Sequence, residues 1–239
     1  MWSSGRCEPL TVEAGLPVPI EIRPVRTARR LRLRFDERRG TLLLTCPPRT
    51  SRRAAVAWAL DQRDWVDAQL ARVLPAEPFA PGAAIPIEGT PALIAWREAA
   101  PRTPRLVEGI LQCGGPLEAL PRRIESFLKR RALDLMSRET AEFAAAAGVT
   151  ARAVSVGDAG TRWGSCSSQG RIRLSWRLIF APAEVRRFVV AHEVAHLRHL
   201  NHGAEFKALE ARLYGAGLAE AKAGLRRWGP RLRRIGRGR

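Results

Sequence analysis

All four histidines of this 239-residue chain, His192, His196, His199 and His202, lie within eleven consecutive positions. The first two frame the motif HExxH, in which Glu193 directly follows the first histidine. On an α-helix, residues four apart project from one face about one turn apart, so both imidazoles can reach a single zinc ion. The Glu193 carboxylate can then hydrogen-bond a water molecule at that ion. The motif therefore predicts a helix with a zinc site near its end.

A catalytic zinc site takes three protein ligands and keeps a fourth position open. His202 stands ten residues after His192, which predicts the third ligand if the helix ends soon after His196. Asn201 and Gly203 can supply the turn that brings His202 back, because both residue types tolerate a left-handed backbone. We therefore expect one zinc ion held by three imidazoles.

Three further residues near the motif have to be weighed as ligands. His199 lies near the same face, and we expect it in solvent or in a supporting position beside the ligands. Glu205 and Glu210 are alternative third ligands, because some zinc enzymes use a downstream glutamate.

The first part of the chain predicts strands. Apolar and charged residues alternate at period two in residues 20–25 and 31–35, and a turn leads from the second of these to the apolar run 41–46. This pattern is typical of half-buried strands and favours a hairpin. A helix follows, with Thr50 or Ser51 as its N-cap.

The second part predicts long helices and one more hairpin. Apolar residues at helical spacing over 121–147 predict a helix that ends at Gly148. Residues 162–180 hold a Ser/Gly turn between two extended arms, which predicts a hairpin. Pro182 and Glu184 suit the first turn of the histidine helix.

These elements predict an α+β protein. We expect a β-rich N-terminal region with one helix at 1–115, a catalytic domain at 116–230 and a basic tail at 231–239. The catalytic domain contains the histidine helix and the adjacent hairpin. No internal repeat is visible in the sequence.

Composition limits the cellular setting and the partners. No apolar run approaches the ~20 residues of a membrane span, and the N-terminus lacks the apolar core of a signal peptide, so we expect a cytoplasmic protein without a membrane partner. No CxxC pair occurs, which disfavours a cysteine zinc ribbon. The net charge of +18 is almost all arginine. It makes nucleic acid a possible partner, but it equally fits arginine on ordinary solvated surfaces.

The segment RWGSCSSQGRIRLSWRLIFAPAEVRRFVVAHEVAHLRHLNHGAEF, residues 162–206, resembles the YgjP-like metallopeptidase domain, a bacterial relative of the SprT-like zincins. The similarity rests on the blocks RWGSCSS, SWRLIFAP, VVAHEVAHL and NH, and extends loosely over most of the chain. It implies zinc ligands at His192, His196 and His202, with Glu193 catalytic. It also implies a minimal zincin-like fold in which the hairpin forms an edge beside the cleft.

Arg162, Trp163 and Ser165 are candidate substrate-binding residues. An edge strand at this position can pair with an extended peptide, and Arg162 can stabilise a developing oxyanion. The alternative is structural, with Trp163 and Trp176 as packed hairpin aromatics and Arg162 in an ion pair. Cys166 is a poor candidate for a nucleophile, because no histidine remains to activate it once three bind metal.

The leading interpretation is a zinc-dependent metallopeptidase that acts on a peptide or protein substrate. One alternative is a metal-dependent nucleotide pyrophosphatase that uses the same site, since a UTP pyrophosphatase label is also attached to the family. Another alternative, from a different class, is a basic nucleic-acid-binding protein with a structural zinc.

Overall fold

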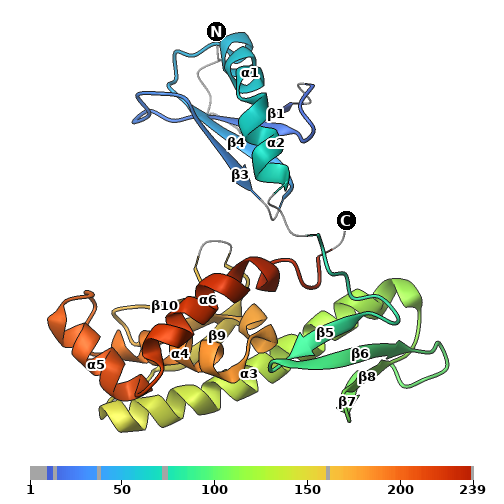
Figure 1. Ribbon diagram of the computed structural model, residues 1–239, viewed down its shortest axis with the longest axis vertical. Coiled ribbons are helices and arrows are strands. Elements are labelled where there is room, and N and C mark those ends of the chain that lie inside the picture. Colours follow the sequence, from blue (N-terminus) through green and yellow to red (C-terminus); the bar gives the residue numbers. More distant parts are fainter. Residues whose placement is uncertain (1–9, 13–14, 37–38, 72–74, 160–161, 238–239) are drawn as a thin grey trace. The chain divides into compact units, whose positions relative to one another are not determined.

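The computed structural model describes residues 10–12, 15–36, 39–71, 75–159 and 162–237 (Figure 1). The chain divides into two units, Met1–Leu74 and Pro75–Arg239. This division differs from the predicted boundary at residue 115. The reason is packing: Ile85, Ile94 and Leu111, from strands before that boundary, share one core with the long helix of the second unit.

The first unit holds a four-stranded sheet of order β1-β2-β4-β3. Its elements are β1 (Leu10–Val12), β2 (Ile20–Pro24), β3 (Arg32–Asp36), β4 (Thr41–Cys46), α1 (Arg52–Asp61) and α2 (Arg63–Ala71). The antiparallel pair β3–β4 is the predicted hairpin, and β2 runs parallel to β4. The Ser51 hydroxyl caps α1 by accepting a hydrogen bond from the Ala54 amide at 3.2 Å. Two helices separated at Gln62 take the place of the single helix expected.

The second unit begins with a sheet of the same topology. Its strands are β5 (Ala84–Ile87), β6 (Thr90–Trp96), β7 (Arg105–Val107) and β8 (Ile110–Cys113), in the order β5-β6-β8-β7. In both sheets the central pair is parallel and each outer pair is antiparallel. A helix follows each sheet. The chain therefore repeats a topology that its sequence does not reveal, because strand pairing constrains the residue pattern and not the identity of the side chains.

The rest of the second unit positions the histidines. Its elements are η1 (Leu117–Ala119), α3 (Leu120–Ala147), β9 (Ala153–Gly157), β10 (Gly164–Cys166), β11 (Arg171–Ser175), η2 (Trp176–Phe180), α4 (Ala183–Ala195), α5 (Ala204–Tyr214) and α6 (Leu218–Leu232). The predicted end of α3 at Gly148 is confirmed, since this glycine has the left-handed φ of 64°. A small sheet of order β10-β11-β9 leaves β10 at an edge.

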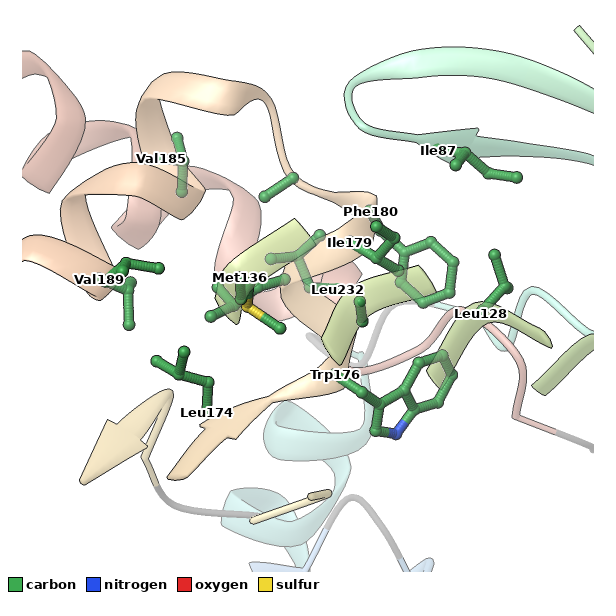
Figure 2. Close-up of a cluster of buried hydrophobic side chains, with 14 of the residues drawn as sticks. Ile87, Leu128, Met136, Leu174, Trp176, Ile179, Phe180, Val185, Val189 and Leu232 are labelled. Atoms are coloured by element: carbon green, nitrogen blue, oxygen red, sulfur yellow. The ribbon is translucent and has the colours of Figure 1, made fainter. Parts of the chain in front are cut away.

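The core of the second unit forms where α3 meets α4, η2 and the sheets (Figure 2). Trp176 and Phe180 from η2 pack edge to face with ring centroids 5.4 Å apart. The Arg186 guanidinium of α4 binds the Glu139 carboxylate of α3 at 2.9 Å, and both side chains are buried. This ion pair and the surrounding apolar contacts fix α4 on α3. None of the described helices is long and apolar enough to cross a membrane.

The described part of the predicted tail is packed and does not project from the unit. Ile235 is fully buried, and Arg231 binds Glu77 at 2.8 Å. The buried guanidinium of Arg177 donates hydrogen bonds to the carbonyls of Leu232 and Ile235. Residues 231–237 therefore belong to the second unit, because their backbone carbonyls and one apolar side chain complete its core.

Candidate active site

Helix α4 ends where the sequence requires it to end. Its last residue is Ala195, and His196 is the C-cap. The next two amides bond to carbonyls three residues back, which tightens the final turn and lets the chain reverse before His202. The predicted left-handed turn is wrong: Gly203 has φ −70°, and Asn201 also avoids positive φ.

The reversal brings His192, His196 and His202 together. One nitrogen from each ring lies within 4.8 Å of the others. Ring centroids are 4.9 Å apart for His192 and His196, and 4.7 Å apart for His196 and His202. Phe206, buried at the start of α5, packs against all three rings at 4.5–5.1 Å. An apolar residue therefore closes one side of the cluster.

The hydrogen bonds of the cluster leave the correct nitrogens free for a metal. His196 Nδ1 lies 3.0 Å from the His199 carbonyl oxygen, which can only accept, so this nitrogen carries the proton. His192 Nδ1 lies 2.7 Å from a carboxylate oxygen of Glu210. The Nε2 atoms of His192 and His196 therefore keep their lone pairs. His192 Nε2 and His202 Nε2 are 3.3 Å apart, and two tetrahedral zinc ligands at ~2.0–2.1 Å are about 3.3–3.4 Å from each other. The donor set fits zinc.

Glu210 contacts the histidine cluster through the Nδ1 atom of His192. Its side chain is almost fully buried, and its two oxygens contact His192 Nδ1 and the Lys222 ammonium at 2.7 and 2.6 Å. Burial raises the pKa of Glu210, but the hydrogen bonds from Lys222 and His192 outweigh it, so the net pKa is lowered and the carboxylate is charged. The other alternative ligand, Glu205, is 85% exposed and faces His199. Among the described residues, neither glutamate belongs to the group of converging ligand atoms.

Glu193 is buried on α4 between the two helical histidines. Its side chain is 5% exposed, and its Oε2 atom has no hydrogen-bond partner among the described residues. Burial raises the pKa of the Glu193 carboxyl to about 7, and the positive charge of Arg162 opposes this rise. A buried carboxylate with a free oxygen is suited to accept a proton from water.

Gly164 of β10 lies directly against Glu193. A Cβ atom on Gly164 would be 2.4 Å from Glu193 Oε1 and 2.6 Å from its Cγ. Only glycine therefore allows the carboxylate to approach the edge strand this closely. The sequence motif RWGSC contains this glycine, but no local pattern reveals which residue occupies the space above it.

The three predicted substrate-binding residues lie together. Arg162, Trp163 and Ser165 line one cavity of about 400 Å³, which Gly164 also lines. Trp163 is half-buried and packs against the core, and Trp176 lies inside it, so both tryptophans pack as the structural alternative predicted. Arg162 is exposed and has no ion pair among the residues described.

Cys166, at the end of β10, is a free thiol. Burial raises the pKa of this thiol, and the negative charge of Glu193 raises it further. A thiol that resists ionisation is a poor nucleophile.

The sequence matches the YgjP-like, metallopeptidase domain over residues 29–227. No curated protein matches the chain. Among solved structures, the metallopeptidase zymogen jannalysin of Methanocaldococcus jannaschii is 14% identical, covers 38% of this chain and 94% of its own, and has a TM-score of 0.35. The zymogen abylysin of Pyrococcus abyssi is 19% identical, covers 44% of this chain and 97% of its own, and has a TM-score of 0.34.

Proposed function

The chain belongs to the YgjP-like metallopeptidase domain family, and on that premise we propose that it is a zinc-dependent peptidase. His192, His196 and His202 are its ligands, and Glu193 is its general base. The observation that supports this most strongly is the convergence of three imidazole nitrogens within 4.8 Å, on the helix that carries the buried Glu193.

Zinc at such a site polarises the carbonyl of the scissile bond and lowers the pKa of a water molecule. Glu193 accepts the proton of the attacking water and donates it to the departing nitrogen. Two observations support this role. Glu193 is buried against Gly164, which holds the carboxylate in place, and its Oε2 atom makes no hydrogen bond to any described residue, so this oxygen can accept the proton.

Glu210 and the His199 carbonyl act through the ligands. Each accepts a hydrogen bond from the Nδ1 of one histidine, which orients the ring and keeps the proton away from Nε2. Lys222 keeps Glu210 charged and in position. The role that we propose for His199 is therefore support by its backbone.

The edge strand β10 is the proposed docking line for the substrate. An extended peptide can add to an edge strand through main-chain hydrogen bonds, as in the zincin-like arrangement that we propose for this unit. Arg162 is close enough for its charge to act on Glu193, and it can stabilise negative charge that develops on the carbonyl oxygen.

The deciding experiment compares zinc-loaded wild type with Glu193→Gln. The substrates are an unfolded protein and UTP, each with and without chelator. We expect chelator-sensitive peptide hydrolysis that falls ~10²–10⁴-fold in the variant, with zinc content unchanged, because glutamine conserves volume and Glu193 is not a ligand. Full activity in the zinc-loaded variant would remove Glu193 as the base.

The same assay separates the alternatives. Hydrolysis of UTP without peptide hydrolysis would favour a pyrophosphatase. Salt-sensitive nucleic-acid binding without hydrolysis of either substrate would favour a basic binding protein with structural zinc.

The cytoplasmic location stays a prediction.

A further inference from the structure

The cavity of about 400 Å³ is lined by residues of the small sheet and by Asp158, Ala159, Arg162 and Trp163. Gly164 both lines the cavity and lies directly against the Glu193 carboxylate, so the cavity shares one wall residue with the proposed base. Trp163 lines the cavity, and its ring is held by packing against α6 and Arg233. A Cβ on Gly229 of α6 would lie 3.4 Å from its ring, and the Arg233 guanidinium lies 4.7 Å from the ring centroid.

The cavity carries an excess of positive charge. Its lining includes Arg162, Arg173 and Asp158. Asp158 is already neutralised, since Arg177 binds it at 3.0 Å and Arg237 at 2.8 Å. Arg162 and Arg173 make no hydrogen bond or ion pair with any residue that the structure describes. Two guanidinium groups are therefore available to a ligand.

Two further features show that this space is shaped for a polar group. The Arg173 guanidinium lies against the backbone of Gly157. A Cβ atom on Gly157 would be 2.5 Å from both Nε and Nη2 of Arg173. The glycine thus leaves room for the guanidinium at the end of β9. The Ser175 hydroxyl, also in the lining, is buried and has no hydrogen-bond partner among the described residues. An unpaired buried hydroxyl costs free energy unless a ligand satisfies it.

We propose that this cavity is a substrate subsite for a carboxylate, so that the enzyme prefers peptides with an acidic group close to the scissile bond. The inference rests on the peptidase function proposed above and adds a substrate class to it. Arg173 binds the carboxylate through charge-assisted hydrogen bonds, to which a planar guanidinium group is well matched, and the charge of Arg162 in the same lining adds to the attraction. The carboxylate belongs either to an aspartate or glutamate side chain or to the C-terminus of the peptide.

Cleavage-site profiling tests the preference. Zinc-loaded protein is incubated with a peptide library from a digested proteome, and the new termini are sequenced by mass spectrometry. We expect acidic residues to be enriched at one fixed position. Matched peptides with Glu or Gln at that position should differ ~10–100-fold in kcat/KM. Peptides with an amidated C-terminus separate the two sources of the carboxylate, because only a side-chain preference survives amidation.

Arg173→Gln should reduce the Glu/Gln ratio towards one. Arg171→Gln is the matched control, since it removes the same charge from an exposed position on the same strand, outside the cavity lining. Cleavage without an acidic preference, or an equal loss of preference in both variants, would overturn the subsite and leave the peptidase function standing.

A measurement without turnover keeps the two proposals separate. Zinc-loaded Glu193→Gln protein is immobilised, and the library peptides that it retains are identified. Acidic peptides should be enriched on this protein. The double variant Glu193→Gln/Arg173→Gln should lose the enrichment, whereas the double variant Glu193→Gln/Arg171→Gln should keep it. If no peptide is cleaved anywhere, the peptidase function fails, and retention alone decides the subsite. Retention of UTP in place of acidic peptides would refute the carboxylate assignment.

Discussion

Replacing Gly164 by alanine places a methyl group inside the space that the Glu193 carboxylate occupies. The new Cβ would lie 2.4, 2.6 and 2.7 Å from Oε1, Cγ and Cδ of Glu193. Non-bonded heavy atoms reach their best separation at ~3.5–4.0 Å, so the carboxylate has to move by roughly 1 Å. It cannot do so freely, because Glu193 is 5% exposed on a buried helix.

A displacement of roughly 1 Å of a catalytic group can cost ~10²-fold in rate. We therefore expect Gly164→Ala to lower kcat/KM by about that factor. Zinc content should stay near that of the wild type, because the ligand nitrogens are oriented by Glu210 and the His199 carbonyl and not by β10. Hydrolysis of an unfolded protein and zinc stoichiometry, measured on the same preparation, give both quantities.

Gly203→Ala is the matched control for this change. Gly203 precedes α5, has φ −70°, and a Cβ there would meet nothing within 4 Å. We expect this variant to keep both activity and zinc. Wild-type activity in Gly164→Ala would refute the close approach of Glu193 to β10, and loss of zinc in that variant would show that the strand supports the ligands as well.

The remaining predictions concern the ligands and the core. His202→Ala should lose zinc and His199→Ala should retain it, as measured by metal analysis after dialysis; the reverse result would refute the ligand assignment. Glu210→Gln should weaken zinc binding ~10–100-fold in a competition titration with a chromophoric chelator, and an unchanged affinity would remove its positioning role. Glu139→Ala should lower the free energy of unfolding by ~3–5 kcal/mol in urea, because it leaves the Arg186 guanidinium buried without its partner; a loss below about 1 kcal/mol would contradict this.

The sequence predicted local elements better than their assembly. The 3.6-residue periodicity and the glycine after it located the helix that ends at Gly148, and residue type narrowed the cap of α1 to Thr50 or Ser51, of which the structure uses Ser51. The boundary at residue 115 differed from the structure because strand periodicity says nothing about which helix a sheet packs on. The tail at 231–239 was predicted from its charge, whereas Ile235 and the backbone carbonyl of Leu232 fix the described part, residues 231–237, in the core.

In the candidate site, too, residues close in sequence could be grouped, whereas contacts between distant elements could not. His192, His196 and His202 could be grouped from sequence because a helical turn and one short loop set their separation. Asn201 and Gly203 were expected to make the turn with a left-handed backbone, but neither adopts it, since a tightened helix end needs no left-handed residue. Glu210 was considered only as a ligand, because its distance from His192 along the chain does not distinguish coordination of a metal from a hydrogen bond to Nδ1.

The groups that act on the ligands and on the base come from elements that no spacing rule connects. Gly164 reaches Glu193 from an edge strand, and Lys222 reaches Glu210 from α6. The contact of Gly164 with Glu193 depends on how α4 is fixed on α3, which the buried pair of Arg186 and Glu139 helps to determine. A change in that core pair should therefore shift the base relative to β10 without touching a zinc ligand. For this reason zinc content and hydrolysis have to be measured separately in every variant of this protein.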